Sequence, residues 1–547
     1  MNTVAAVFAD FEETFLGGES KLNSTVAGRP VIDRTLERLM RIPELDRRCL
    51  FVRPRDRDIA AETLQRGGLS DDIDLLPLDD GQRPRRELLR AARKWNLKAW
   101  RGSPLGTTWF DEYVEPRCVA QVMDHYQCQG VLCLNGYQPV LDPGIAAIML
   151  RRQDEYSGEA PQVFSQAPPG LAGVLLRREI VRDLLEQNIP LGLLLSYRPE
   201  IARGDPINQP ICAQIDPDVV HTPGRLTGDT RRSRELLSAA LSELGEECDA
   251  GQLCAWWRRI AHGGPEPLPR ELEVELTTEY PLPDSRLRPP AGRIPPRRLE
   301  NLAALEARAR ELAAYDDRMI FLGGHGDPLA HPHFAESCQR IRAAGVCGLA
   351  VGTPLVNLSE ENLEALVEHK IDLLMVYLDA DSAETYQQIH RVDHFEQVLG
   401  NIERIERLRR ERVSPQPIVV PRITRCSTTL PEMEQFYDRW IQTTGGAMIA
   451  GYNDYGGILP PDELLHCGPT IREPCRRLDS RLTLLANGSV VLCGQDYAGS
   501  APVGEWLAET LSESWHSEGL AAARRCHAGL DFSNWSLCQN CREWFRP

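Results

Sequence analysis

The sequence has 547 residues, a formal net charge of −17 and 42% hydrophobic residues. This length is too great for one hydrophobic core and predicts roughly three or four domains. The acidic balance argues against nucleic acid as the main partner, because phosphate binding requires a basic surface. The sequence has no run of about 18 apolar residues that could span a membrane. Its start, MNTVAAVFADFEETF, lacks the basic region of a signal peptide, so we expect a cytoplasmic protein.

The sixteen cysteines are the most informative residues. Without an export signal we expect a reducing compartment, in which clustered thiols indicate a metal site before a disulfide. Most of these cysteines occur singly in apolar or helical surroundings, where a cysteine usually behaves as a small buried hydrophobe. The tail differs, because a closely spaced pair follows two further thiols there.

Residues 1–194 alternate between apolar runs and helical patterns, starting with a buried strand at 3–9. This alternation predicts a three-layer, Rossmann-like α/β domain with a largely parallel sheet. Residues 195–267 are expected to form a linker, rich in Pro and Gly up to about 232, followed by two bridging helices at 231–244 and 251–264.

Three segments of the N-terminal domain carry a resemblance to nucleotidyltransferases of the GT-A type: Lys21 with the following AGRPVIDRTLERL, RGSPLGTTWFDE at 101–112, and GYQPVLDP at 136–143. The resemblance implies a basic loop that cradles nucleotide phosphates and an aspartate that holds a divalent metal. Here the loop that begins at Asp10 is acidic, and Tyr137 occupies the aspartate position, where it cannot replace a carboxylate as a hard-cation ligand. We expect the fold to be retained and nucleotidyl transfer to be lost, with an active nucleotidyltransferase as an alternative.

Residues 268–464 contain six strand-and-helix alternations, which predict a partial (β/α)6 barrel of the TIM type. The expected strands are 271–280, 318–324, 348–355, 371–380, 417–424 and 447–452.

This middle domain resembles the radical SAM superfamily, through GGHGDPLAHPHF at 323–334, the segment 378–405 and the first barrel strand. The resemblance implies that the turn formed by Gly323, Gly324, Gly326 and Asp327 accepts the amino group of S-adenosylmethionine (SAM). A turn kept for barrel closure is the alternative. His325, His331 and His333 share this loop, either as a metal site or as solvated side chains.

The family's three cluster cysteines correspond to Tyr280, Asp284 and Leu287 in this chain. Three thiolates hold the SAM-binding 4Fe–4S cluster in that family, and none of these side chains offers one. We therefore expect that the barrel holds no primary cluster and does not cleave SAM reductively.

Residues 465–547 form the tail. An Asn487-Gly488 turn between two apolar runs predicts a β-hairpin. The four candidate ligands are Cys475, Cys493, Cys538 and Cys541. Four thiolates suit either tetrahedral zinc or a 4Fe–4S cluster, so both metals stay open on ligand type alone.

The tail resembles the SPASM domain, an iron–sulfur module found after many radical SAM barrels. The resemblance covers about 475–543 and implies one 4Fe–4S cluster of the SPASM type, with Cys467 and Cys526 as possible extra thiols. The order of the three parts resembles the spiro-SPASM family.

The expected function is an accessory or non-orthodox role in the modification of a peptide or small molecule, with an unidentified peptide, protein or small molecule as partner. The alternatives are an active radical SAM enzyme, a nucleotidyltransferase, and a structural zinc site in the tail. The sequence identifies no catalytic residue.

Overall fold

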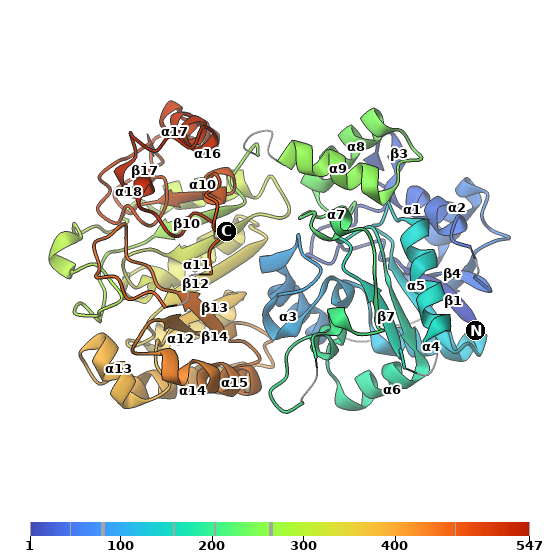
Figure 1. Cartoon of the computed structure of the whole chain (residues 1–547), viewed down its shortest axis with the longest axis horizontal. Coiled ribbons are helices and arrows are strands. Elements are labelled where there is room, and N and C mark those ends of the chain that lie inside the picture. The colour runs from blue at the N-terminus through green and yellow to red at the C-terminus, as the bar shows by residue number, and fades with distance from the viewer. Residues whose placement is uncertain are drawn as a thin grey trace. The chain divides into compact units, whose positions relative to one another are not determined.

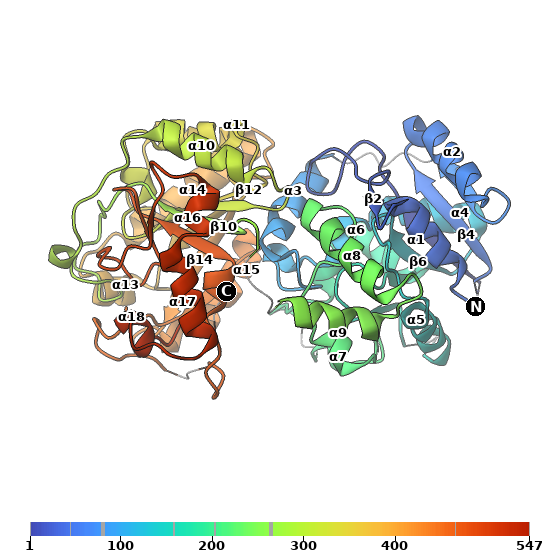
Figure 2. The ribbon, with the colours of Figure 1, turned by 90° about the horizontal axis from the view of Figure 1, so that it is seen from above.

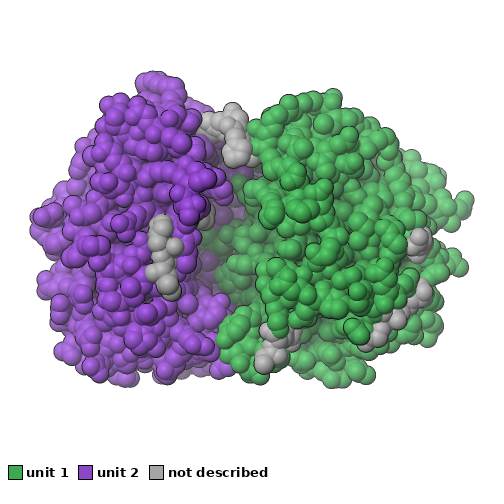
Figure 3. All heavy atoms as spheres, viewed as in Figure 1, with its two compact units in different colours: residues 1–263 green, residues 264–547 purple. Residues whose placement is uncertain are grey.

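The computed structural model describes residues 2–43, 45–77, 83–156, 159–201, 204–261, 266–464 and 467–545. The chain divides into two compact units, which Figure 3 colours separately: unit 1, residues 1–263, and unit 2, residues 264–547.

Unit 1 contains a seven-stranded sheet in the order β5-β4-β1-β6-β8-β7-β9. Figure 1 labels β1, β4 and β7 of this sheet. β4, β1 and β6 are parallel, whereas β8 runs antiparallel to both of its neighbours. The strands are β1 (Thr3–Phe8), β2 (Thr25–Val26), β3 (Arg29–Pro30), β4 (Arg47–Val52), β5 (Asp74–Pro77), β6 (Gly130–Asn135), β7 (Gln162–Ser165), β8 (Val174–Arg177) and β9 (Cys212–Ala213). The helices are α1 (Val31–Met40), α2 (Arg57–Gly67), α3 (Arg83–Arg93), α4 (Pro116–Tyr126), α5 (Pro143–Glu155), α6 (Arg178–Gln187), α7 (Pro217–Val220), α8 (Arg231–Leu244) and α9 (Ala250–Ala261).

The central strand β1 is buried on both faces. Ala5 and Val7 face a core built with α1, α5, α8 and α9, whereas Val4 and Ala6 face a second core built with α4 and α6. A strand covered by helices on both faces requires a continuous apolar run, which is what the sequence shows here. The predicted three-layer, mostly parallel α/β architecture is confirmed.

The segment that the sequence predicted as a linker belongs to unit 1 instead. β9 adds a parallel strand beside β7, and the buried Arg225 guanidinium forms an ion pair with Glu112 at 2.7 Å. α8 and α9 lie side by side in Figures 1 and 2 and pack into the first core, so they do not bridge two units. Residues 262–264 of the predicted second helix lie outside the described residues.

Unit 2 contains a nine-stranded sheet in the order β15-β14-β13-β12-β11-β10-β16-β17-β18. The strands are β10 (Glu271–Glu275), β11 (Met319–Gly323), β12 (Gly348–Thr353), β13 (Leu373–Tyr377), β14 (Ile418–Arg425), β15 (Met448–Gly451), β16 (Arg481–Leu484), β17 (Ser489–Val491) and β18 (Gly504–Glu505). The helices are α10 (Leu302–Leu312), α11 (Phe334–Ala343), α12 (Glu360–Glu368), α13 (Ala383–His390), α14 (Phe395–Glu411), α15 (Met433–Thr444), α16 (Leu511–Trp515), α17 (Glu518–Ala528) and α18 (Ser536–Gln539).

The six strands from β10 to β15 are parallel and adjacent in chain order. At least one helix follows each of the first five, and α10 and α11 lie side by side in Figure 2. All six predicted barrel strands are therefore present.

The tail continues the barrel sheet. β16 pairs in parallel with β10, and β17 pairs antiparallel with β16, which confirms the predicted hairpin. Gly488 has φ +100°, a conformation that favours glycine and closes this turn. Trp506 and Trp515 of the tail are buried in the same core as the barrel. The residues predicted as a separate domain from 465 therefore share a sheet and a core with the barrel.

Within the described ranges, no helix is both long and apolar enough to cross a bilayer.

Candidate functional site

The four tail cysteines line one pocket of unit 2. Cys475 precedes the short 3-10 helix Arg476–Asp479 that leads into β16, and Cys493 follows β17. Cys538 lies in α18, and Cys541 follows that helix. The hairpin and α18 thus bring together thiols that are far apart in the sequence. The other walls are largely apolar, with Leu478, Leu492, Leu537 and Trp544 among them.

The electrostatics of the pocket show that the thiols are near neighbours. Burial, with a smaller contribution from the charges of other cysteines in the set, raises the pKa of Cys493 and of Cys538 to about 12. Burial also raises the pKa values of Cys475 and Cys541. A bound cationic centre is what allows such buried thiols to be held as thiolates.

Arg472 fixes the backbone of the last two cysteines. Its guanidinium donates hydrogen bonds to the carbonyl oxygens of Cys538 at 2.7 Å and Cys541 at 3.0 Å. The same group lies over the ring of Phe532, 4.2 Å from its centroid. The two hydrogen bonds orient the C-x2-C pair, and the guanidinium adds one positive charge beside its thiols.

His527, on the last turn of α17, also lines the pocket. Its Nδ1 accepts a hydrogen bond from the backbone N–H of Cys475 at 3.3 Å. Within the described residues its buried Nε2 has no hydrogen-bond partner. Sequence reasoning missed this residue, because a single histidine beside Cys526 carries no spacing signal.

The donor set fits a group held by four thiolates, which is the requirement of a 4Fe–4S cluster or of tetrahedral zinc. Among the residues that the structure describes, no three His, Cys, Asp or Glu side chains are grouped so as to hold a single metal ion. The four thiols line one pocket without the close grouping that a single bound ion requires.

Two cysteines considered as extra ligands lie elsewhere. Cys467 is exposed and contacts Arg425 at 3.2 Å, and Cys526 of α17 does not line the pocket.

At the barrel, the three positions that the resemblance aligns with cluster cysteines have other contacts. The Arg288 guanidinium carbon lies 3.3 Å from the centre of the Tyr280 ring, and the same guanidinium donates to the backbone oxygen of His325. Leu287 packs beside a small apolar cluster that contains Cys426, and Asp284 is exposed. A cation stacked on an aromatic ring thus occupies this loop in place of a thiolate set, so these residues do not fit a primary cluster.

The glycine turn after β11 is packed against the first barrel loop. A Cβ on Gly326 would lie 1.9 Å from the oxygen of Thr277, and Gly324 has φ +92°. Asp327 donates its backbone N–H to Glu279 at 2.7 Å, and its Oδ1 accepts from Leu329 N at 3.1 Å. These contacts give the turn a role in barrel closure.

The carboxyl of Asp327 has one buried oxygen, Oδ2, with no hydrogen-bond partner among the described residues. Burial raises the pKa of this carboxyl to about 6, although a hydrogen bond from the Thr353 side chain lowers it in part. An amine could bind here, as the resemblance implies, and its place as a SAM acceptor stays a prediction.

His325 joins the barrel turn to the tail. Its Nε2 lies 3.1 Å from the carbonyl oxygen of Gly494, which directly follows Cys493. The ring packs against Tyr455 and Tyr497, with centroid distances of 6.0 and 5.7 Å, and the two tyrosine rings are themselves 6.3 Å apart. Burial lowers the pKa of His325 to about 3. The loop after Cys493 therefore covers this part of the barrel.

The other two histidines of the loop have separate partners. The Nε2 of His331 lies 2.9 Å from the oxygen of Leu299, and His333 is paired with Glu336 at 3.6 Å. The three histidines do not form one metal site.

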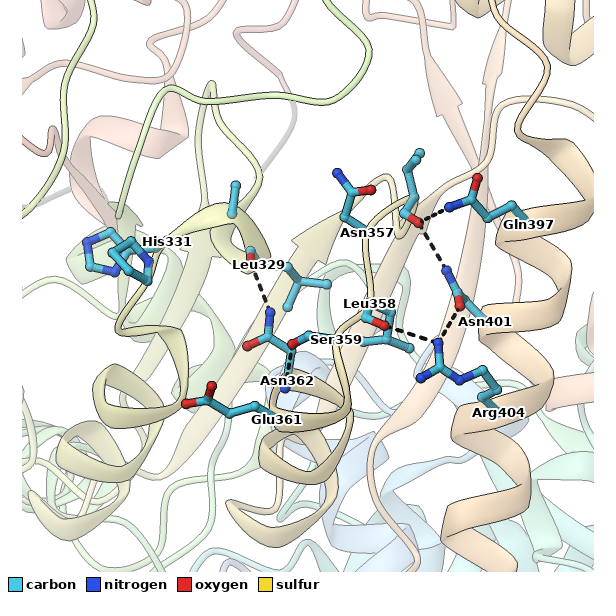
Figure 4. Close-up of a pocket in the computed structure, with 13 residues that line it drawn as sticks. Leu329, His331, Asn357, Leu358, Ser359, Glu361, Asn362, Gln397, Asn401 and Arg404 are labelled. Carbon is cyan, nitrogen blue, oxygen red and sulfur yellow. Dashed lines mark hydrogen bonds between the residues drawn. The ribbon is translucent and has the colours of Figure 1, made fainter.

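A further hollow lies between the β11 and β12 loops and α14 (Figure 4). Asn362, Asn401 and Arg404 point toward backbone carbonyls in Figure 4 and donate to them at 2.9 to 3.1 Å. These three side chains of the hollow are therefore used in bonds to the protein's own backbone.

Unit 1 has a pocket at the carboxyl ends of β1, β4 and β6. Asp10 there pairs with Arg53 at 2.9 Å and with Arg86 at 2.8 Å. The Tyr137 hydroxyl bonds to Ser20 and accepts from Lys21 N. The loop that the resemblance aligns with the phosphate-binding loop thus contains Asp10, whose negative charge is already balanced by two arginines.

Two family models match the chain. The Radical SAM superfamily model matches residues 283–428, and the SPASM model, an iron-sulfur cluster-binding domain, matches residues 475–542. A curated relative from Treponema pallidum (strain Nichols), an uncharacterized protein, is 25% identical over 295 residues, which is 51% of this chain and 79% of the relative.

Three solved structures show low overall similarity. BtrN in complex with AdoMet and 2-DOIA is 16% identical, covers 50% of this chain and 93% of its own, and has a TM-score of 0.33. A cytidylyltransferase from Leptospira borgpetersenii is 14% identical, with coverages of 48% and 95% and a TM-score of 0.35. Streptococcus suis SuiB bound to precursor peptide SuiA is 12% identical, with coverages of 63% and 79% and a TM-score of 0.39.

All three TM-scores are low, and the domains of this chain are identified by the two family models. Both models fall on unit 2, where the parallel barrel strands and the four-thiol pocket lie. The chain carries a radical SAM domain followed by a SPASM iron–sulfur domain, an order compatible with the spiro-SPASM family.

Proposed function

We propose that this protein holds one 4Fe–4S cluster in its tail, through Cys475, Cys493, Cys538 and Cys541, and holds no primary SAM cluster in its barrel. The observation that carries the proposal is the contrast between two sites of unit 2. One pocket gathers four thiols, whereas the loop expected to hold the other cluster contains Tyr280 stacked on Arg288.

The cluster, when bound, supplies one-electron transfer and structural cross-linking of the tail. The chain's own residues do the rest. The thiolates hold the group, Arg472 positions the C-x2-C pair, and the apolar walls limit water access.

The barrel supports an accessory role better than SAM cleavage. The loop after Cys493 is attached to the barrel by His325, and Arg297 donates to the carbonyl oxygen of Tyr497 at 2.8 Å. The proposed role is to assist the modification of a peptide or small molecule, by electron transfer or by binding the partner.

A second candidate is an enzyme of the radical SAM class that acts on a peptide or metabolite. The family match over 283–428 and the unpartnered Oδ2 of Asp327 favour it. Formation of 5′-deoxyadenosine from SAM with dithionite distinguishes the two, because only the second candidate produces it.

The direct test of the proposal counts iron and sulfide in protein purified without oxygen. The variants Cys475→Ala and Cys538→Ala are compared with Cys526→Ala, whose thiol lies outside the pocket. We expect about four irons in the wild type and in the control, and a loss in the two ligand variants. Bound zinc in the wild type would contradict the proposal.

A further inference from the structure

His527 is the polar side chain of the four-thiol pocket whose bonding is incomplete. The residue is 3% exposed, and its ring packs edge-on against Phe532 at a centroid distance of 4.8 Å. Its Nε2 is buried and has no hydrogen-bond partner among the described residues. A buried donor without a partner costs free energy, so such an atom in a native site calls for an explanation.

The other ring nitrogen determines what Nε2 can do. The backbone N–H of Cys475 donates to Nδ1 at 3.3 Å, so Nδ1 carries the lone pair. In that tautomer Nε2 carries the hydrogen and is a donor. Nε2 therefore has no lone pair with which to bind a metal, and His527 is not a fifth ligand.

None of the four cysteine sulfurs accepts a hydrogen bond from Nε2 in this structure, so the acceptor has to come from a group bound in the pocket. The pocket that His527 lines also contains all four thiols, and its remaining walls are largely apolar. The N–H of Cys475 and the contact with Phe532 hold the ring in place. We propose that Nε2–H of His527 donates a hydrogen bond to a bridging sulfide of the tail's iron–sulfur cluster.

This inference rests on the proposed function, since it requires a cluster in the pocket. It also assigns His527 an effect on redox chemistry. The reduced cluster carries one more negative charge than the oxidised cluster, so a donor to sulfur stabilises the reduced form more. His527 thus raises the midpoint potential of the cluster.

The test uses the full chain with its cluster, purified without oxygen. His527→Phe keeps a flat ring but removes both nitrogens, and His527→Gln keeps an N–H donor. Cys526→Ala is the matched control, because it changes the neighbouring residue on α17 without touching the pocket. Iron content, the midpoint potential, and pulsed EPR of the reduced protein labelled with 15N-histidine are measured for each.

We expect a 15N coupling in the wild type and in Cys526→Ala that is lost in His527→Phe. The midpoint potential should become more negative in His527→Phe and return toward the wild-type value in His527→Gln. Normal iron content with no 15N coupling in the wild type, or an unchanged potential in His527→Phe, would overturn the inference alone. If His527→Phe fails to hold iron, the midpoint potential of His527→Gln decides. A potential more negative than that of the wild type overturns the inference, and a wild-type potential supports it. A wild type without an iron–sulfur cluster overturns the proposed function and the inference together.

Discussion

The guanidinium carbon of Arg288 lies 3.3 Å from the ring centre of Tyr280, the residue that the resemblance to radical SAM barrels aligns with the first cluster cysteine. A cation on an aromatic face is a stabilising contact, and it places a positive charge where a cluster would need thiolates. The same arginine is bonded to the backbone of His325 in the glycine turn. These contacts hold two barrel loops together without a metal.

The first prediction concerns the stability provided by this pair. Tyr280→Leu removes the aromatic face under Arg288, so we expect the free energy of unfolding of unit 2 to fall by about 0.5–2 kcal/mol. Tyr280→Phe keeps the ring and should cost less. Thermal unfolding measured by calorimetry checks both, and an equal loss in the two variants would show that the hydroxyl, not the ring, is responsible.

The second prediction concerns Asp327 and pH. Burial raises the pKa of its carboxyl from 3.8 to about 6. Burial disfavours the charged form of this carboxyl. Its contribution to the free energy of unfolding is therefore fully present below about pH 4 and is lost as the pH rises through about 6. Asp327→Asn imitates the protonated form, so it should unfold at a higher temperature than the wild type at about pH 7.5 and at a similar temperature at about pH 4. A less stable Asn variant at the higher pH would indicate that the carboxylate has a cationic partner, such as the amine of a bound ligand.

The third prediction concerns Arg472. Arg472→Ala removes the two hydrogen bonds to the carbonyl oxygens of Cys538 and Cys541. Residues that orient metal ligands typically change affinity by about 10–100-fold, so we expect iron to be lost faster to a chelator. The time course of iron loss is followed by absorbance, with Arg476→Ala, an exposed arginine outside the pocket, as the control. Equal rates in the two variants would remove the positioning role.

The fourth prediction concerns the pocket of unit 1. Asp10 is already paired with Arg53 and Arg86, and the resemblance to nucleotidyltransferases aligns Tyr137 with their metal-binding aspartate. Calorimetric titration of the full chain with CTP and Mg²⁺ should therefore give no binding heat. A saturable signal that disappears without Mg²⁺ would revive nucleotidyl transfer as an activity.

The short-range patterns of the sequence predicted most of the fold. Strands such as β12 and β13 are apolar runs, β10 alternates acidic and apolar residues, and the Asn487-Gly488 turn is a local signal for a hairpin. Long-range pairing was not visible in the same way. The parallel ladder between β16 and β10, in which Leu272 lies opposite Leu482, joins segments about 200 residues apart in the sequence and is decided by tertiary packing.

In the candidate site, too, local motifs could be predicted from the sequence and long-range contacts could not. Thiol spacing pointed to the four cysteines, because a C-x2-C pair and a hairpin are readable motifs. His527 and Arg288 were not predicted, since each acts through a contact with a distant residue and has no motif of its own. The stretch from 195 was interpreted as a linker for its Pro and Gly content, whereas the buried pairing of Arg225 with Glu112 holds it in unit 1.

The central claim is that one cluster is present, in the tail. Mössbauer spectroscopy of protein loaded with 57Fe, combined with iron and sulfide analysis, tests it most directly. The account predicts about four irons per chain in a single 4Fe–4S species, which is lost in Cys538→Ala and unaffected by added SAM. About eight irons per chain, with part of the spectrum changed by SAM, would contradict it.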